Sequence, residues 1–268
     1  MNRRAWLGVV LALIPASQMG AATVDVDCDA GSALGPAFRS LKPGDTVLVG
    51  GTCRENLVIQ AELQGITIEG KGKAAIDAPD ASLPAIQVLG REVTIRGLTI
   101  TGGFFGIAIN RGATAVIDRI TIENASHSDI EVSQNSFGRI VNTTIQRCKQ
   151  NGIMVMGSSS AHIGVLRSDD KAPSPNIIKS NGADGISVLR ASTARIIGNS
   201  LSGNRRNGLA IQQVSHADVA GNVFDENGEA GIRVAGNSGV NLADSVMRLF
   251  EQPNKTNRPN GLLASVAK

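Results

Sequence analysis

A short apolar string recurs along this sequence at a fixed interval. Each copy is one residue, glycine in all but one case, followed by an apolar–any–apolar triplet, as in Gly152-Ile153-Met154-Val155. Successive copies are 23, 23, 33, 23 and 23 residues apart and begin at Gly106, Asp129, Gly152, Gly185, Gly208 and Gly231. A fixed interval of this length is typical of a solenoid, in which every repeat forms one coil and stacks on its neighbours.

Each repeat also contains two further short apolar segments, such as Arg139–Val141 and Thr143–Ile145. Three segments in one coil of this length are too short to be helices. Gly198-Asn199 and Gly221-Asn222 separate the second and third segments of later repeats, where a tight bend needs residues that tolerate left-handed backbone. The pattern predicts an all-β protein, a parallel β-helix of about eight or nine coils.

Asparagine recurs four residues before the repeated glycine, at Asn181, Asn204 and Asn227. Equivalent side chains on stacked coils lie about 4.8 Å apart, so these amides are expected to form a hydrogen-bonded ladder. Cys148 takes the same register in its own coil. We therefore expect its thiol to be buried and free.

The first 22 residues have the features of an export signal. Arg3-Arg4 is followed by the apolar run Leu7–Ile14 and by the small residues Gly20-Ala21-Ala22, which predicts cleavage after Ala22. The apolar run is too short to span a membrane. Arg3-Arg4 also resembles a twin-arginine motif, so the export route stays open. Cleavage lowers the formal net charge from +3 to +1, because two arginines leave, and the charge then gives no argument for a nucleic-acid or membrane partner.

The remaining chain divides into an amino-terminal cap with a first strand, residues 23–56, and a β-helix, residues 57–268. A short amphipathic helix over Ser32–Leu41 is expected to cover the first coil. Cys28 and Cys53 flank this segment and can pair in an oxidising compartment. A short helix over 244–251 and a last strand at 261–262 are expected at the other end, where an uncapped coil could stack on a second copy.

The 33-residue interval carries an insertion at residues 164–175, between the second and third strands of its coil. It holds Arg167, Asp169, Asp170 and Lys171. The insertion is interpreted as a surface excursion, with a partner-binding loop as the alternative.

The strings Leu41–Val47, Arg54–Ile59 and Ile66–Gly72 resemble the opening coils of polysaccharide lyases and pectin esterases. The mature chain as a whole resembles the pectate-lyase-like right-handed β-helix superfamily. This resemblance implies a right-handed parallel β-helix. It does not choose an activity, because the superfamily includes lyases, esterases, galacturonases, epimerases, phage tailspikes and binding proteins.

Several motifs of those enzymes are missing. The sequence has no Gly-x-x-Asp-Phe-Ile-Phe-Gly-like segment of pectin esterases, and neither the Asn-x-Asp nor the Gly-His-Gly of galacturonases. Ser126–Asp129 comes nearest to the Asp-Pro-His of epimerases and lacks the proline. Pectate lyases hold calcium with a cluster of acids beside a basic residue, and that pattern has to be sought on the strands themselves.

In the superfamily the repeated triplet forms the floor of the substrate groove. Side chains alternate along a strand, so the apolar residues point inward and the others outward. The outward pairs are Ala108 and Asn110, Glu131 and Ser133, Met154 and Met156, Ser187 and Leu189, Ala210 and Gln212, and Arg233 and Ala235. Just after each strand come Arg111, Gln134, Gly157, Arg190, Gln213 and Gly236.

Glu131 is the only acid among the outward pairs, and we expect Asn110 and Met154 to be its lateral neighbours. Acid–base catalysis on a sugar needs paired carboxylates, and calcium needs several oxygen ligands, so calcium is expected only if the protein is a lyase. Arg111 and Arg190 take equivalent positions three coils apart, about 14 Å. That spacing favours contacts with successive units of an acidic polymer over a single reaction centre.

Three functional hypotheses follow. The first is an exported, periplasmic or extracellular protein that binds an extended acidic polysaccharide without catalysis, through Asn110, Arg111, Glu131, Gln134, Arg190, Gln212 and Arg233. The second is a polysaccharide lyase or epimerase in which Arg111, Glu131 and Arg190 are catalytic. The third is a structural or assembly module. The mature chain has neither Trp nor Tyr, which counts against binding of neutral sugars.

Overall fold

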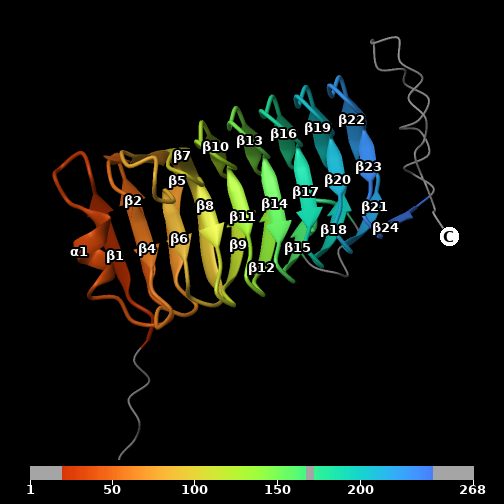
Figure 1. Ribbon diagram of the computed structural model, residues 1–268. Helices are drawn as coiled ribbons and strands as arrows, with labels where there is room; N and C mark the ends of the chain where they lie inside the picture. The colour runs from red at the N-terminus through yellow and green to blue at the C-terminus, as the bar shows by residue number, and fades with distance from the viewer. Residues whose placement is uncertain (1–19, 167–171, 244–268) are drawn as a thin grey trace, which may run out of the picture.

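The protein is described by a computed structural model that covers residues 20–166 and 172–243. Its chain winds into a right-handed parallel β-helix of about nine coils, with almost no helix (Figure 1). The predicted fold is therefore confirmed. The predicted export signal up to residue 19, the middle of the insertion, and the elements expected after residue 243 lie outside the described residues.

The repeated triplet of the sequence forms an eight-stranded parallel sheet, sheet B, which crosses the front of Figure 1. Neighbouring strands are in register, so that Ile130 aligns with Ile107 on one side and Ile153 on the other. The strands of sheet B are β4 (Leu57–Ile59), β6 (Ile86–Val88), β8 (Ile107–Ile109), β11 (Ile130–Val132), β14 (Ile153–Met156), β17 (Ile186–Leu189), β20 (Leu209–Ile211) and β23 (Ile232–Val234).

The other two faces form one continuous sheet, sheet A. The long strands β5 (Thr67–Ala78) and β7 (Val93–Gly102) run through both faces and join them. The second strands of the coils are β9 (Thr114–Asp118), β12 (Phe137–Val141), β15 (Ser160–Ile163), β18 (Thr193–Ile197), β21 (His216–Ala220) and β24 (Gly239–Leu242). The third strands are β10 (Thr121–Glu123), β13 (Thr144–Gln146), β16 (Ile177–Lys179), β19 (Ser200–Ser202) and β22 (Val223–Asp225).

The amino-terminal segment contributes strands as well as a cap. Strand β1 (Thr23–Asp27) pairs with β2 (Thr46–Gly50), and both β2 and β3 (Thr52–Cys53) pair with β5. The expected helix forms as α1 (Leu34–Phe38), a single turn inside the predicted range. Glu55 accepts the backbone N–H groups of Leu34 and Gly35, and so caps this helix from another part of the chain. The disulfide between Cys28 and Cys53 is present.

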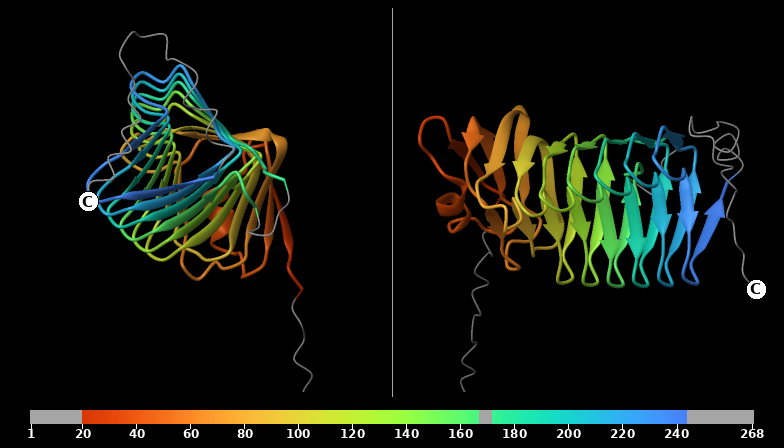
Figure 2. Two further views of the ribbon diagram at one scale, coloured as in Figure 1. Left: turned by 90° about the vertical axis from the view of Figure 1, so that its right-hand side faces the viewer. Right: turned by 45° about the horizontal axis from the view of Figure 1, so that its top comes forward.

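The core is a column of aliphatic side chains enclosed by the three faces of the solenoid. Seen end-on, successive coils lie one behind another (Figure 2). Ile107, Ile130, Ile153 and Ile186 stack along it and are fully buried. Each such side chain stabilises the fold by about 1.5–3 kcal/mol. A narrow parallel stack needs side chains of similar size in every coil, which explains the scarcity of aromatic residues in the sequence.

Two asparagine ladders run along the buried bends. In the predicted ladder, Asn181 Nδ2 donates to Asn204 Oδ1 at 3.0 Å, and Asn204 Nδ2 donates to Asn227 Oδ1 at 2.9 Å. A second ladder joins Asn176, Asn199 and Asn222 at the bend between the second and third strands. These amides satisfy backbone groups that would otherwise be buried without a partner.

Cys148 ends the first ladder, as predicted, and is buried and free. Its N–H and its thiol both donate to Asn181 Oδ1. A Cβ placed at Gly152 would lie 2.7 Å from Nδ2 of Asn181, the ladder asparagine of the next coil. Glycine at this position therefore leaves room for that asparagine. Asp129 takes the glycine position one coil earlier, next to the coil in which Cys148 replaces the asparagine. The smaller thiol leaves room for the buried aspartate side chain.

The insertion leaves the solenoid between β15 and β16, as predicted. Ser174 N–H donates to Gly164 O at 2.7 Å and closes the base of the loop. Pro173 packs against the bend of the next coil, where a Cβ on Gly198 would lie 2.5 Å away from it. In the described part of the chain, no helix has the length and apolar character needed to cross a membrane.

Candidate functional site

The outward residues at the centre of the sheet B strands form one row along the solenoid, called the floor row. Its members are Val58, Gln87, Ala108, Glu131, Met154, Ser187, Ala210 and Arg233. Although these side chains point away from the core, most are buried, and Glu131 and Ser187 are only 9% and 4% exposed. The centre of the floor row is therefore largely covered by its neighbours, while its end members Val58 and Arg233 are exposed.

Residues two positions before each strand overhang the floor row. This ridge row consists of Ser128, Asn151, Asp184 and Asn207. Asn151 Nδ2 lies 4.0 Å from Met154 Sδ, which shows how the ridge covers the floor. Asp184 Oδ1 accepts Asn207 Nδ2 at 2.7 Å, and Asp184 N–H donates to Asn151 Oδ1 at 3.1 Å. This polar row was not predicted, because its members precede the alternating strand residues from which outward side chains were inferred.

The register corrects one expectation about Glu131. Its lateral neighbours are Ala108 and Met154. Asn110 follows Ala108 by two residues and is level with Ser133. Parallel in-register pairing requires this arrangement, because each residue faces the one exactly one repeat away. Glu131 thus stands between two apolar neighbours and is not flanked by an amide.

Burial raises the pKa of Glu131, and a hydrogen bond from the Ser133 side chain partly opposes that shift. Asn110 Oδ1, near the same part of the floor, is buried without a hydrogen-bond partner among the described residues. Buried polar atoms are normally satisfied. The Glu131 carboxyl group and, two positions beyond Ala108 on the neighbouring strand, the unsatisfied Asn110 amide oxygen could each bind a hydroxyl group of a ligand.

The residues just after each strand form a second row, called the edge row, beside the floor. Its members are Arg111, Gln134, Gly157, Arg190, Gln213 and Gly236. Backbone hydrogen bonds link them from coil to coil, for example Gly112 N–H to Gln134 O at 2.9 Å. Arg111 and Arg190 are exposed, and both have left-handed backbone with φ of 58°. This conformation costs a non-glycine residue about 1–2 kcal/mol, whereas Gly157 and Gly236 adopt it without strain.

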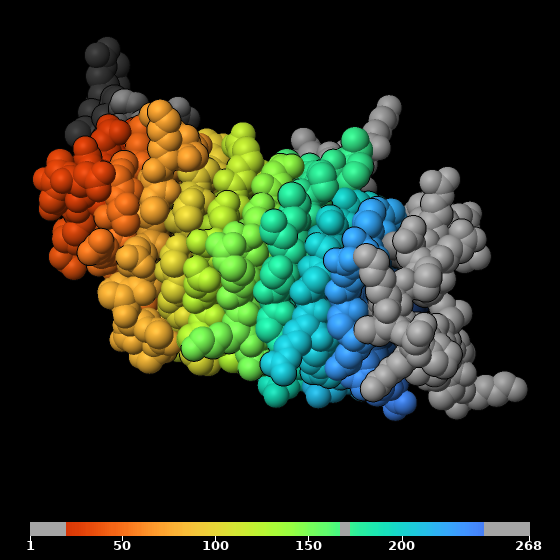
Figure 3. Space-filling model, turned by 90° about the horizontal axis from the view of Figure 1, so that it is seen from above, coloured from red at the N-terminus to blue at the C-terminus, as the bar shows by residue number. Residues whose placement is uncertain are grey.

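The predicted ligand-binding residues thus fall into two groups. Arg111, Gln134 and Arg190 share the exposed edge row, while Asn110 and Glu131 lie on the buried floor. Gln212 is half-buried, and Arg233 is exposed on the last strand of sheet B; both lie several coils from Glu131. Coils cover the molecule as successive bands (Figure 3), so these residues are spread along the solenoid and do not converge on one centre.

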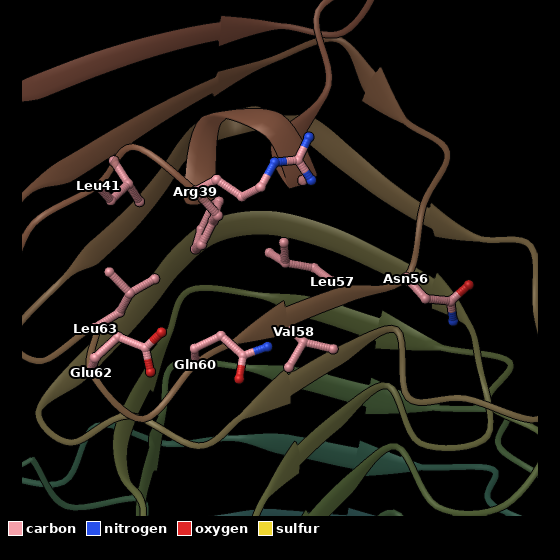
Figure 4. A pocket seen from close by; sticks show the side chains of 10 residues that line it. Arg39, Leu41, Asn56, Leu57, Val58, Gln60, Glu62 and Leu63 are labelled. Carbon is pink, nitrogen blue, oxygen red and sulfur yellow. The ribbon is translucent and has the colours of Figure 1, made fainter.

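A cavity of about 620 Å³ continues the floor at its amino-terminal end, between α1 and β4 (Figure 4). Val58 of the floor row lines it together with the buried Leu57 and Leu63, and Arg39 and Glu62 stand on its rim. Strand β4 is the edge strand of sheet B, and α1 lies beside it. The floor row therefore ends at a pocket beside the cap.

One cluster of potential metal-ligand side chains lies at the amino-terminal cap. Within the described residues, one group of three such side chains comes close together, namely Cys28, Cys53 and Glu55. The two sulfurs form the disulfide, and the Glu55 carboxylate caps α1. Burial raises the pKa of Cys148 to about 12, so its thiol stays protonated.

Comparisons with known proteins agree with the fold. Residues 47–169 and 158–248 match a family described as "Right handed beta helix region". No curated protein matches the sequence. The structure is similar to pectate lyase Pel9A, with a TM-score of 0.60 and 14% identity over 87% of this chain and 72% of that one.

Two other similar structures are longer than this protein. The enzymatically active domain of bacteriophage CBA120 tailspike protein 2 has a TM-score of 0.56 at 12% identity, over 82% of this chain and 43% of that one. The periplasmic alginate epimerase AlgG has a TM-score of 0.50 at 14% identity, over 82% and 55%. At these identities the likeness shows a shared fold.

Proposed function

This chain belongs to the right-handed β-helix family, and we propose that it is an exported protein that binds an extended acidic polysaccharide along sheet B. The edge row carries the proposal. Arg111 and Arg190 occupy equivalent positions of that row, about 14 Å apart. Both have left-handed backbone, which glycine would adopt with less strain. Both arginines are exposed beside sheet B, so their side chains are available to a ligand.

The chemistry of the surface supports an acidic ligand. Guanidinium groups bind carboxylates through paired, charge-assisted hydrogen bonds, and Gln134 and Gln213 offer neutral donors and acceptors in the same row. The similar solved structures include a pectate lyase and an alginate epimerase, whose names refer to acidic polysaccharides. The Cys28–Cys53 disulfide suits a periplasmic or extracellular location.

A second candidate function is catalysis by a polysaccharide lyase or epimerase. It is favoured by the raised pKa of the buried Glu131, which would let the carboxyl group hold a proton in mildly acidic solution and deliver it to a leaving oxygen. Arg111 would hold the substrate carboxylate. Calcium would be required only in this alternative. Even there, a floor row with one carboxylate offers a divalent cation few ligands.

Affinity electrophoresis and absorbance spectroscopy distinguish these functions. The mature protein is incubated with alginate, pectate and a glycosaminoglycan, and retardation is compared with the ultraviolet absorbance of unsaturated product, with and without calcium. Binding without product, weakened by Arg190→Ala and unchanged by Arg119→Ala, supports the proposal. Product that disappears in Glu131→Gln supports the enzyme instead. Failure to bind any of the polymers would contradict both and favour a structural module.

A further inference from the structure

Three basic side chains share one register position on the outer face of sheet A. Arg139 of β12 aligns with His162 of β15, and His162 aligns with Arg195 of β18. We call these three residues the basic row. Their positions are about 4.8 Å apart, and no carboxylate lies between them in the row. The basic row stands on a different sheet from the floor row and the edge row.

This arrangement differs from the rest of sheet A. Elsewhere, charged side chains of adjacent coils pair with the opposite sign, as Glu69 does with Arg96 and Glu123 does with Arg147. Like charges placed directly opposite each other on neighbouring strands destabilise a sheet. Two arginines that flank a histidine without an interleaved acid therefore favour a compensating negative charge, and in its absence they keep the histidine neutral.

Two nitrogen atoms of the row are buried without a partner. Arg139 Nε and His162 Nδ1 make no hydrogen bond to any described residue. Buried polar groups in folded proteins nearly always have a partner, either from the protein or from solvent and ligands. The unsatisfied atoms and the missing negative charge occur at the same place.

Phe137 holds both side chains in position. The Arg139 guanidinium carbon lies 4.8 Å from the centre of the Phe137 ring, and the His162 ring meets the same ring edge-on at 5.1 Å. Ser160 and Thr193 follow Phe137 in register and place hydroxyl groups beside the basic row. The two nitrogen-bearing groups are thus fixed before any ligand arrives, which reduces the entropy lost on binding.

The charges around the row set its limits. On the carboxyl-terminal side, Arg195 aligns with Asp218, whose carboxylate accepts Asn241 Nδ2 at 2.8 Å and lies 3.5 Å from His216 Nε2. On the amino-terminal side, Arg139 aligns with Val116, which carries no charge. The part of the row that lacks a negative neighbour is therefore its Arg139–His162 half.

We propose that the basic row is an oxyanion-binding site, separate from the sheet B surface, in which a carboxylate, sulfate or phosphate group sits between Arg139 and His162. The guanidinium group supplies a planar pair of donors that fits such oxygens, and the imidazole supplies another donor. The ligand is either a free ion or an acidic group on a larger molecule. The site depends on neither the edge row nor the proposed polysaccharide binding.

Binding at this site is linked to protonation. In the free protein, burial together with Arg139 and Arg195 lowers the pKa of His162, so the ring is neutral at neutral pH. A bound oxyanion adds the negative charge that the row lacks and raises that pKa. The anion then binds more tightly as the pH falls, by up to about tenfold per pH unit between the two pKa values.

Nuclear magnetic resonance tests this site directly, because the chain has only three histidines, His127, His162 and His216. Inorganic sulfate is the main probe, since its own charge is constant over the range in which histidine titrates, and ionic strength is held fixed with chloride. Sulfate should raise the pKa of His162 and leave His127 unchanged. Inorganic phosphate and a monomeric uronate, measured in parallel, show whether the site prefers a tetrahedral ion or a carboxylate.

Variants separate the proposed site from general charge effects. Arg139→Gln should weaken sulfate binding about tenfold or more. His162→Gln should bind with little dependence on pH. The matched control Arg119→Gly removes an exposed arginine from the bend between β9 and β10, outside the basic row, and should change nothing. The proposal is wrong if none of the three anions shifts His162, or if Arg119→Gly weakens binding as much as Arg139→Gln does.

Discussion

Replacing Asp129 with asparagine should stabilise the solenoid, and the gain should grow as the pH rises. The Asp129 side chain is fully buried. Its Oδ1 atom accepts the Ala125 N–H at 3.4 Å, whereas Oδ2 has no hydrogen-bond partner in the described structure. Burial, opposed by hydrogen bonds from the backbone, raises the pKa of this carboxyl from 3.8 to about 8. The folded protein therefore keeps Asp129 protonated at neutral pH.

The magnitude follows from the difference between the folded and unfolded pKa values. Between about pH 4 and pH 8 the folded state holds one proton that the unfolded state releases, so the free energy of unfolding falls as the pH rises. At 1.36 kcal/mol per pH unit, this costs the folded state about 2 kcal/mol at pH 5 and about 4 kcal/mol at pH 7. Asparagine has a similar shape and no proton to lose, so the Asp129→Asn variant avoids this cost.

Guanidinium unfolding followed by far-ultraviolet circular dichroism measures the effect, at pH 5, 6 and 7 for the wild type and Asp129→Asn. Each sample is incubated until the unfolding and refolding curves coincide. The stability difference should widen by about 1.4 kcal/mol for each pH unit. An equal difference at pH 5 and pH 7 would refute the reasoning, because Asp129 would then be ionised in the folded protein throughout that range.

Two further predictions concern the same framework. Asn at position 148 should clash with Asp129, so Cys148→Asn should destabilise the wild type but restore the ladder in the Asp129→Gly background. A double-mutant cycle by denaturation should give a favourable coupling of about 1–3 kcal/mol, and additive effects would argue against the proposed fit between the two side chains. The Cys28→Ala/Cys53→Ala variant should lose about 3–4 kcal/mol of unfolding free energy, because the disulfide closes a loop with a sequence separation of 25. An unchanged denaturation midpoint would show that α1 and the strands hold the cap without the disulfide.

The repeat made the fold predictable from the sequence. A fixed interval determines the coil, and the coil determines which residues stack, so the ladder through Asn181 and the buried Cys148 could both be anticipated. The ladder through Asn199 was available from the same periodicity, but the Gly-Asn pairs were interpreted only as bends.

The candidate site was less predictable, because the burial of outward side chains depends on how neighbouring loops cover a strand. Alternation correctly placed Glu131 on the outer side of its strand. Its burial comes from the stacked coils and from the ridge row, which no periodicity of the strand itself reveals. Asp184 was missed for the same reason. The strain at Arg111 and Arg190 also became visible only with the backbone angles.

Calorimetric titration with acidic oligosaccharides of increasing length tests the proposed polysaccharide binding most directly. Affinity should rise with length until the oligomer spans the distance of about 14 Å between Arg111 and Arg190, and then level off. Arg111→Gly/Arg190→Gly should weaken binding by about tenfold for each arginine and leave the fold as stable or slightly more stable, because glycine relieves the left-handed strain.

Arg119→Gly is the matched control, since Arg119 is also exposed and left-handed, with φ of 53°, but lies between β9 and β10. It should bind like the wild type. Affinity that does not depend on oligomer length, or an equal loss in Arg119→Gly and in the double variant, would contradict the assignment of sheet B as the polysaccharide-binding surface.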